Sequence, residues 1–245
     1  MASSELATRL LGPRRQGPLR TALGFLQGVA FRLAGAHRHD RARLEHVQGT
    51  PLLVLPTVFN PRLLRTGAFF ASVIAARKLG AGAQVLDLGT GSGVCAVFAA
   101  RHARRVVAVD INRAAVRCAA LNARLNQLEE RIECLHGDLF APLGEQRFDV
   151  IFFNPPFIVG APAHARDFAW RSPDVAARFA AGLSDRLTTG GHAYLLLSTF
   201  GDACALFVDE LARRGFALSV LAARRYINER VTVVEVGMPA VAGGP

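Results

Sequence analysis

The feature that most constrains this chain is a regular alternation of short β-branched runs with segments of helical length. Strands are predicted over 84–87, 106–110, 132–136, 148–153 and 193–198, and helices over 93–102, 113–126, 173–187 and 202–214. This order is typical of a parallel sheet with helices on both faces. The last two runs, 216–222 and 231–236, have no helix between them, so we expect an antiparallel hairpin at one sheet edge. The sequence therefore predicts an α/β fold with a mostly parallel, seven-stranded sheet.

The first 65 residues carry most of the positive charge. They hold ten arginines and three acidic residues, which is +7 of the chain's formal +10. Helical spacing over 19–33 predicts a basic helical N-terminal extension over 1–50, packed on a main domain over 51–245, in which 51–59 is extended and 62–79 helical. The apolar stretch 21–31 behind Arg14 and Arg15 also allows a signal or transit peptide. It is too short to span a bilayer, and we favour the helical extension without membrane insertion.

Four cysteines, Cys95, Cys118, Cys134 and Cys204, lie far apart and form no C-x-x-C pair. No pair of histidines has ligand-like spacing with a carboxylate, so we expect neither a disulfide framework nor a metal site. The cysteines are best interpreted as small buried hydrophobic residues in a reducing compartment, and we expect a cytoplasmic protein. The oligomeric state is left open.

A glycine-rich turn follows the first strand of the alternating region. Its sequence is DLGTGSG at 87–93, and the next strand ends in Asp110, 21 positions after Gly89. Glycines at such a turn let the backbone approach a ligand at a helix N-terminus, and the distal acid accepts from a ribose. The order of strand, turn, helix and acid predicts a nucleotide site.

The acids around this turn indicate which nucleotide it is. Asp87 stands two residues before the first glycine, where a carboxylate repels a pyrophosphate, so a dinucleotide or ATP is disfavoured. S-adenosyl-L-methionine (AdoMet) has a cationic amino-acid end and a nucleoside end, and it favours nearby carboxylates. Asp138, in the turn after the third strand, is placed to accept from the adenine amino group. The residues expected to bind the cofactor are Asp87, Gly89, Thr90, Gly91, Gly93, Asp110, Ile111, Asp138, Leu139 and Asn154.

The fourth strand of the alternating region, 148–153, runs into Asn154-Pro155-Pro156-Phe157. The carboxyl ends of the strands are where ligands bind in open α/β folds. The Asn154 side-chain oxygen and the Pro155 carbonyl together accept both hydrogens of an amino group, which aims its lone pair at a methyl donor. Phe157 stacks on a planar substrate. We therefore expect the catalytic residues to be Asn154, Pro155, Pro156 and Phe157.

Over 51–236 the chain resembles the class I AdoMet-dependent methyltransferases with a (D/N)PP(Y/F) motif. The resemblance implies a Rossmann-like fold, and the hairpin at the end fits the family's sheet. It also implies that Asp87 and the glycine turn hold the methionine end of AdoMet, Asp110 the ribose hydroxyls and Asp138 the adenine. By the same resemblance, 154–157 is the catalytic loop.

Two branches of this family share features with the chain. Pro56-Thr57-Val58-Phe59, with Gly67 eight residues later, is similar to the entrance motif of ribosomal-RNA guanine N2-methyltransferases. Pro61-Arg62 and the small helical N-terminal region resemble HemK-like release-factor glutamine methyltransferases. Both resemblances imply transfer to an amino or amide nitrogen of a macromolecule, either an RNA base or a protein glutamine.

Two other functions remain open. The first is methylation of a small molecule, in which the segment after the catalytic loop closes over an apolar pocket. The second is a non-catalytic partner protein that keeps the fold. A macromolecular substrate is favoured, and the basic N-terminal region favours RNA through phosphate neutralisation. The expected substrate residues are Phe59, Arg62, Gly67, Phe168 and Trp170.

Overall fold

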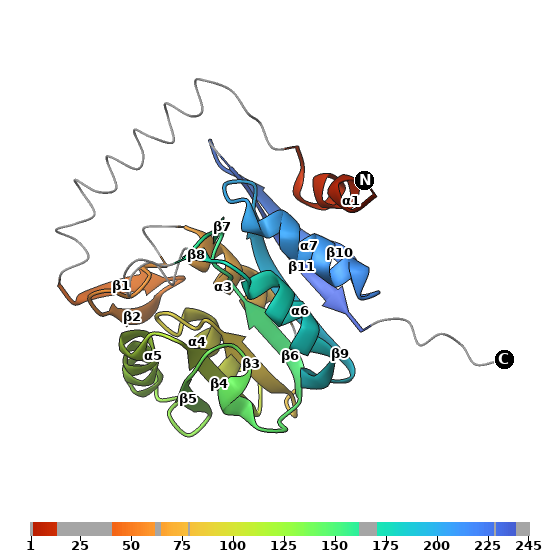
Figure 1. Cartoon of the computed structure of the whole chain (residues 1–245). Helices are drawn as coiled ribbons and strands as arrows, with labels where there is room; N and C mark the ends of the chain where they lie inside the picture. Colours follow the sequence, from red (N-terminus) through yellow and green to blue (C-terminus); the bar gives the residue numbers. More distant parts are fainter. Residues whose placement is uncertain are drawn as a thin grey trace.

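A computed structural model of the chain describes residues 2–13, 41–61, 65–77, 79–161, 171–227 and 229–238. Its centre is a seven-stranded sheet in the order β10-β11-β9-β6-β3-β4-β5 (Figure 1). The strands are β3 (Gln84–Leu88), β4 (Arg105–Asp110), β5 (Ile132–His136), β6 (Phe148–Phe153), β9 (Leu187–Ser198), β10 (Ala217–Arg225) and β11 (Arg230–Gly237). Only β11 runs against its neighbours, β9 and β10. The mostly parallel sheet with a C-terminal antiparallel hairpin is thereby confirmed.

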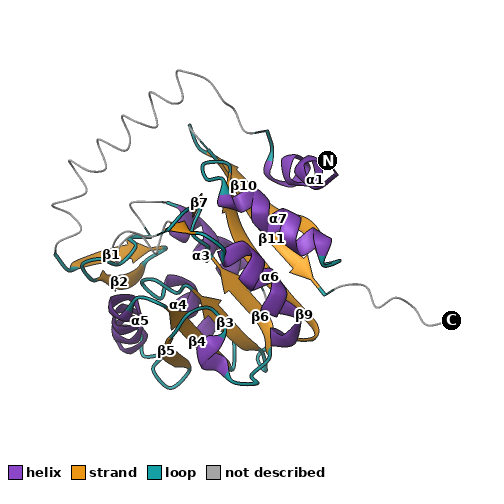
Figure 2. Cartoon of the chain, in the orientation of Figure 1, coloured by secondary structure: helices purple, strands orange, loops and turns teal. Residues whose placement is uncertain are grey.

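Helices cover both faces of this sheet (Figure 2). One face carries α3 (Thr66–Ala76), α4 (Val94–Ala100) and α5 (Arg113–Leu125), and the other carries α6 (Val175–Arg186) and α7 (Ala203–Arg213). A single 3₁₀ turn, η1 (Ala141–Leu143), lies between β5 and β6.

Two adjacent phenylalanines of β6 illustrate why the sheet is buried on both sides. Successive side chains of a strand point to opposite faces. The Phe152 ring centroid lies 5.8 Å from that of Phe70 in α3, whereas the Phe153 centroid lies 5.0 Å from Phe179 in α6 and 5.8 Å from Phe207 in α7. The apolar run 150–153 of β6 therefore reflects two packed layers rather than one.

The N-terminal helix α1 (Ala2–Leu11) packs on the sheet edge that β10 and β11 form, beside α7 (Figure 1). Its Ala7, Leu10 and Leu11 side chains are buried in the main hydrophobic core. A helical, packed N-terminal segment is thus present. The helix predicted over 19–33 lies outside the described residues.

A β-hairpin occupies residues that the sequence assigned to the helical extension and the start of the domain. It consists of β1 (Arg43–Val47) and β2 (Thr50–Val54), which pair antiparallel. Arg43–Val47 is a strand rather than a helix because it pairs along its whole length with the apolar strand β2. The polar sequence of Arg43–Val47 does not by itself predict this pairing. The domain boundary placed after residue 50 falls inside this hairpin and stays a prediction.

Side-chain hydrogen bonds join the hairpin to α5, and the buried Asn122 makes two of them. Asn122 is fully buried, and its Oδ1 accepts a hydrogen bond from the Leu53 backbone N–H at 2.7 Å. Its Nδ2 donates to the Leu53 carbonyl at 2.7 Å and to the Ser92 carbonyl in the glycine-rich turn at 2.8 Å. Asn122 therefore pairs with β2 as a neighbouring strand would, and it links the hairpin to the turn.

After β6 the chain forms β7 (Ile158–Val159), which pairs parallel with β8 (Arg171–Ser172). Phe168 and Trp170, expected to contact substrate, lie outside the described residues, as does Arg62. In the part of the chain that the structure covers, no helix is both long and apolar enough to cross a membrane.

Candidate active site

A cavity of about 380 Å³ opens at the carboxyl ends of β3, β4 and β6. This volume is in the range of pockets that enclose small ligands. Of the site residues predicted from the sequence, those that line the cavity are Phe59, Gly67, Asp87, Gly89, Thr90, Gly91, Asp110, Ile111, Asp138, Leu139, Asn154, Pro155, Pro156 and Phe157. The residues at the ends of β3, β4, β5 and β6 and in the turns that follow are brought together because parallel strands place their carboxyl ends along one edge. Phe59, and Gly67 at the start of α3, complete this set.

Asp87, at the end of β3, is buried and fixes the glycine-rich turn. Its Oδ2 accepts hydrogen bonds from the Thr90 hydroxyl at 2.6 Å and from the Ala96 backbone N–H at 2.9 Å. Burial raises the pKa of the Asp87 carboxyl to about 7, although these two hydrogen bonds oppose the rise. A cation placed beside Asp87 favours the carboxylate form and offsets the cost of its burial.

Asp110, at the end of β4, also binds backbone groups on both sides of the cavity. Its Oδ2 accepts from Gly91 N–H at 2.9 Å, and its Oδ1 accepts from Asn112 N–H at 2.8 Å. Burial raises the pKa of this carboxyl as well, opposed by the backbone donors. Since each carboxylate oxygen can accept more than one hydrogen bond, Asp110 retains capacity for ligand hydroxyls.

Gly93 is the one predicted and described cofactor residue that does not line the cavity. It precedes α4 with φ of 79°, and a Cβ atom added there would lie 2.9 Å from the Ala119 Cα in α5. Position 93 requires glycine because the backbone has a positive φ there and because α4 and α5 pack closely at this point. Gly89 and Gly91, which do line the cavity, have φ of 64° and 56°.

Asp138 has a partner that the sequence analysis missed. Its Oδ2 accepts from the Arg178 guanidinium at 2.7 Å, and the same guanidinium contacts Asp174 at 3.0 Å. Asp174 and Arg178 both line the cavity. The first turns of α6 therefore approach the side of the cavity that we assigned to adenine. No local signal reveals this pair, because Asp138 and Arg178 are 40 positions apart.

Asn112 is a second missed residue, and here a local signal existed. Its side chain accepts from Ala114 N–H at 2.9 Å and so caps α5, as an Asn before a helical run often does. Its Nδ2 also donates to the Thr57 carbonyl at 3.4 Å. Thr57 has a φ of 67°, which is unfavourable for a β-branched residue, so the contact supports a strained turn at the cavity wall.

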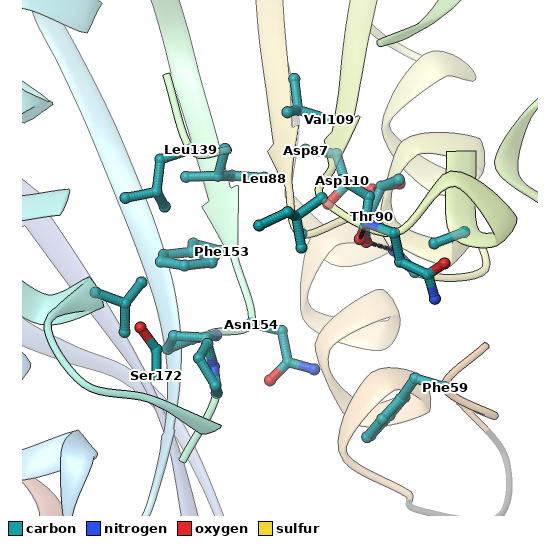
Figure 3. A pocket seen from close by; sticks show the side chains of 18 of the residues that line it. Phe59, Asp87, Leu88, Thr90, Val109, Asp110, Leu139, Phe153, Asn154 and Ser172 are labelled. Carbon is teal, nitrogen blue, oxygen red and sulfur yellow. Dashed lines mark hydrogen bonds between the residues drawn. The ribbon is translucent and has the colours of Figure 1, made fainter. Parts of the chain in front are cut away.

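Asn154 contributes a hydrogen-bond acceptor to the site that no described residue satisfies. Its side-chain Oδ1 is buried and has no hydrogen-bond partner among the described residues. Figure 3 shows the Asn154 amide between the Phe59 ring on one side and the Phe153 ring on the other. A buried amide oxygen without a donor costs about 1–3 kcal/mol, so a ligand N–H at this position is favoured.

Phe157 contributes less open surface than stacking on a substrate suggests. It lines the cavity, but only 5% of it is exposed. Its carbonyl accepts from Ala203 N–H, the first residue of α7, at 3.0 Å. A Cβ atom added to Gly201 would lie 1.8 Å from that carbonyl oxygen. The segment before α7 therefore holds the end of the Asn154–Phe157 loop in place.

Metal-binding side chains do not gather at this site. No group of three His, Cys, Asp or Glu residues that could hold a metal ion occurs within the described ranges. The polar groups that face the cavity are suited to an organic ligand.

The sheet order, the glycine-rich turn and the loop after β6 define the class of Rossmann-like methyltransferases. Within that class the chain belongs to the methyltransferase small domain family, whose model matches residues 50–213. It is 33% identical over 142 residues to "Ribosomal RNA small subunit methyltransferase C" of Alcanivorax borkumensis, covering 58% of this chain and 40% of that protein. It is 40% identical over 118 residues to "Release factor glutamine methyltransferase" of Gloeobacter violaceus, covering 47% and 41%.

Solved structures agree on the fold. The T. thermophilus 16S rRNA N2 G1207 methyltransferase, in complex with AdoMet and guanosine, superposes with a TM-score of 0.55 at 27% identity, over 80% of this chain and 50% of that one. The M. jannaschii tRNA m1G37 methyltransferase has a TM-score of 0.58 at 20% identity, over 82% and 55%. The chain spans less than half the length of the two curated relatives above.

Proposed function

We propose that the chain is an AdoMet-dependent N-methyltransferase that acts on an amino or amide nitrogen of a macromolecule. The observation that carries the proposal is the buried Asn154 Oδ1, which has no partner among the described residues. Asn154 lines the same cavity as Asp87, Asp110 and the glycine-rich turn. The release factor glutamine methyltransferase and the solved 16S rRNA N2 G1207 methyltransferase both support transfer to nitrogen.

The residues present fit AdoMet. The buried Asp87 carboxylate suits the cationic amino-acid end, and Asp110, with two backbone donors already bound, suits the ribose hydroxyls. Ile111 and Leu139 offer apolar surface, and Asp138 offers an acceptor for the adenine amino group. Positive φ at Gly89 and Gly91 gives a turn with no side chain in the way of the ligand.

At the acceptor end the protein's task is to orient a nitrogen. Asn154 Oδ1 accepts one N–H of the acceptor and the Pro155 carbonyl accepts the other, so that the lone pair faces the methyl donor. When bound, AdoMet supplies an electrophilic methyl group: the lone pair forms the N–C bond, the C–S bond breaks with its electrons on sulfur, and the nitrogen then loses a proton to solvent. The loop's anchorage to α7 keeps this geometry rigid.

The test is transfer of tritiated methyl from AdoMet into extract of a strain that lacks the gene. We expect label in macromolecules, and we expect Asn154→Ala to lose most turnover while it binds AdoMet with nearly unchanged Kd. Loss of both properties together would mean that Asn154 is structural. Wild-type protein that labels no fraction would contradict the proposal and favour a non-catalytic partner.

Nuclease and protease sensitivity of the label separate the two macromolecular substrates. Label confined to the small-molecule fraction would favour the second candidate function, methylation of a metabolite. We expect the protein to act in the cytoplasm, since Cys95, Cys118, Cys134 and Cys204 form no disulfide, which suits a reducing compartment.

A further inference from the structure

A patch of arginine and exposed apolar side chains lies at the tip of the β10–β11 hairpin. We call Phe200, Arg224, Arg225 and Ile227 the hairpin rim. Arg230 N–H donates to the Thr199 hydroxyl at 2.9 Å, and Thr199 N–H donates to the Arg230 carbonyl at 3.0 Å, so the end of β9 and the hairpin tip are neighbours. Because β9 and β10 point the same way as β3, β4 and β6, the rim lies at the cavity end of the sheet.

The rim borders two walls of the cavity. The Arg224 guanidinium lies over the Phe69 ring of α3, with its Cζ 5.0 Å from the ring centroid, and Gly67 at the start of α3 lines the cavity. On the other side, Phe200 directly precedes Gly201, whose backbone packs against the Phe157 carbonyl. A ligand with one group in the cavity therefore reaches the rim with its neighbouring groups.

The chemistry of the rim fits a nucleic acid. Phe200 is 48% exposed, and Ile227, two positions after Arg225, is 97% exposed. Arg225 is exposed and, among the described residues, has no ion pair. The nearest acid of the hairpin, Glu229, accepts a hydrogen bond from the Ser198 hydroxyl. Arg224 and Arg225 are consecutive residues of β10, so their side chains leave the strand on opposite faces, and Arg224 lies on the face of α3. Guanidinium groups bind phosphates, and an exposed aromatic ring stacks on an unpaired base.

We propose that the hairpin rim binds single-stranded RNA next to the acceptor nucleotide. The RNA backbone crosses the hairpin tip, where Arg224 contacts a phosphate on one face of β10 and Arg225 a phosphate on the other, and Phe200 stacks on a base that neighbours the one in the cavity. The Phe69 ring holds the Arg224 guanidinium in place, which lowers the entropy lost on binding. A glutamine-bearing peptide lacks the regular negative charge that arginines on both faces of the hairpin tip would recognise. This inference rests on the proposed methyltransferase function.

The binding test uses a fluorescein-labelled, single-stranded RNA of mixed sequence and about 16 nucleotides. Kd is measured against salt concentration for wild type, Arg225→Glu and Arg224→Ala/Arg225→Ala. The matched control is Arg104→Ala/Arg124→Ala, which removes the same charge from two exposed arginines at the opposite end of the sheet. We expect the double rim variant to bind about tenfold more weakly, with the slope of log Kd against log salt reduced by about 1–2, and the control to match wild type.

Arg225→Glu keeps the inference testable if the double variant folds poorly, because Arg225 packs on no ring and pairs with no acid in the described part of the chain. Equal loss of binding in the rim and control variants would overturn the inference, as would wild-type Kd and slope in Arg225→Glu. Phe200→Ala is expected to weaken binding without changing the salt slope.

A methyl-transfer assay separates this inference from the proposed function. If RNA is labelled and Arg225→Glu raises KM for RNA at unchanged kcat, the inference is supported. Label only in protease-sensitive material, transferred equally well by Arg225→Glu, overturns the rim as an RNA site and leaves the methyltransferase proposal intact. Wild-type protein that transfers no methyl group overturns the proposed function, and the binding test still decides whether the rim holds RNA.

Discussion

The buried Asp87 makes cofactor affinity depend on pH in a direction that the structure specifies. Its pKa is raised to about 7 mainly by burial, so the side chain changes from mostly neutral to mostly ionised between pH 6 and pH 8. A cationic ligand group beside it binds the carboxylate and not the neutral acid. We therefore expect AdoMet affinity to increase as pH rises through 7, and Asp87→Asn to remove this dependence.

The magnitude follows from the ionised fraction. With a pKa of about 7, the carboxyl is about 10% ionised at pH 6 and about 90% at pH 8, and an apparent Kd scales inversely with the competent fraction. The expected fall in Kd is about tenfold across this interval. Asn at position 87 still offers an oxygen to Thr90 and Ala96, so it tests the charge with little change in the turn.

Isothermal titration of AdoMet at pH 6, 7 and 8, with wild type and Asp87→Asn side by side, measures this effect. The variant controls for titration of AdoMet's own amino group, because only the difference between the two proteins reports Asp87. Equal pH dependence in both proteins would refute the assignment of Asp87 to the cationic end of the cofactor.

The same raised pKa has a consequence for the stability of the ligand-free protein. An acid whose folded-state pKa lies above its unfolded value contributes stability that is present below about pH 4 and is lost as pH rises through about 7. Without ligand, Asp87→Asn should therefore unfold at a higher temperature than wild type at pH 8. Its free energy of unfolding should exceed that of wild type by at most about 4 kcal/mol at pH 8, with no such gain at pH 4. Thermal unfolding at both pH values measures this, and a variant less stable than wild type at pH 8 would contradict it.

Three further changes test the packing around the site. Asn122→Ala removes the hydrogen bonds to the Leu53 N–H, the Leu53 carbonyl and the Ser92 carbonyl, and of these groups the Leu53 carbonyl keeps the Cys118 thiol as a donor. We expect a loss of about 3–5 kcal/mol in urea unfolding, and a change under about 1 kcal/mol would argue against a bridging role. Gly201→Ala places a Cβ atom against the Phe157 carbonyl, so turnover should fall at least about tenfold while AdoMet affinity is kept. The control is Gly80→Ala, where a Cβ atom meets nothing within 4 Å, and it should match wild type. Gly93→Ala combines positive φ with contact at Ala119, and we expect about 2–4 kcal/mol of destabilisation; wild-type stability would mean that the turn relaxes freely.

Much of the fold followed from local patterns. The β-branched runs of β3, β4, β5, β6 and β9 predicted the parallel strands, and the missing helix between β10 and β11 predicted the antiparallel hairpin. Each pattern depends on residues close together in the sequence, where alternation and turn chemistry act directly. The glycine-rich turn and Asn154–Phe157 were found for the same reason, because strand, turn and motif are contiguous.

Other features depended on the tertiary structure, because their partners are far apart along the chain. The hairpin β1–β2 is held by Asn122, 69 positions from Leu53, and Asp138 is paired with Arg178, 40 positions away. No periodicity encodes such contacts, since they arise only when the helices pack on the sheet. Burial had the same origin: the sequence placed a carboxylate at Asp87, but the surrounding core decided that its pKa lies near 7.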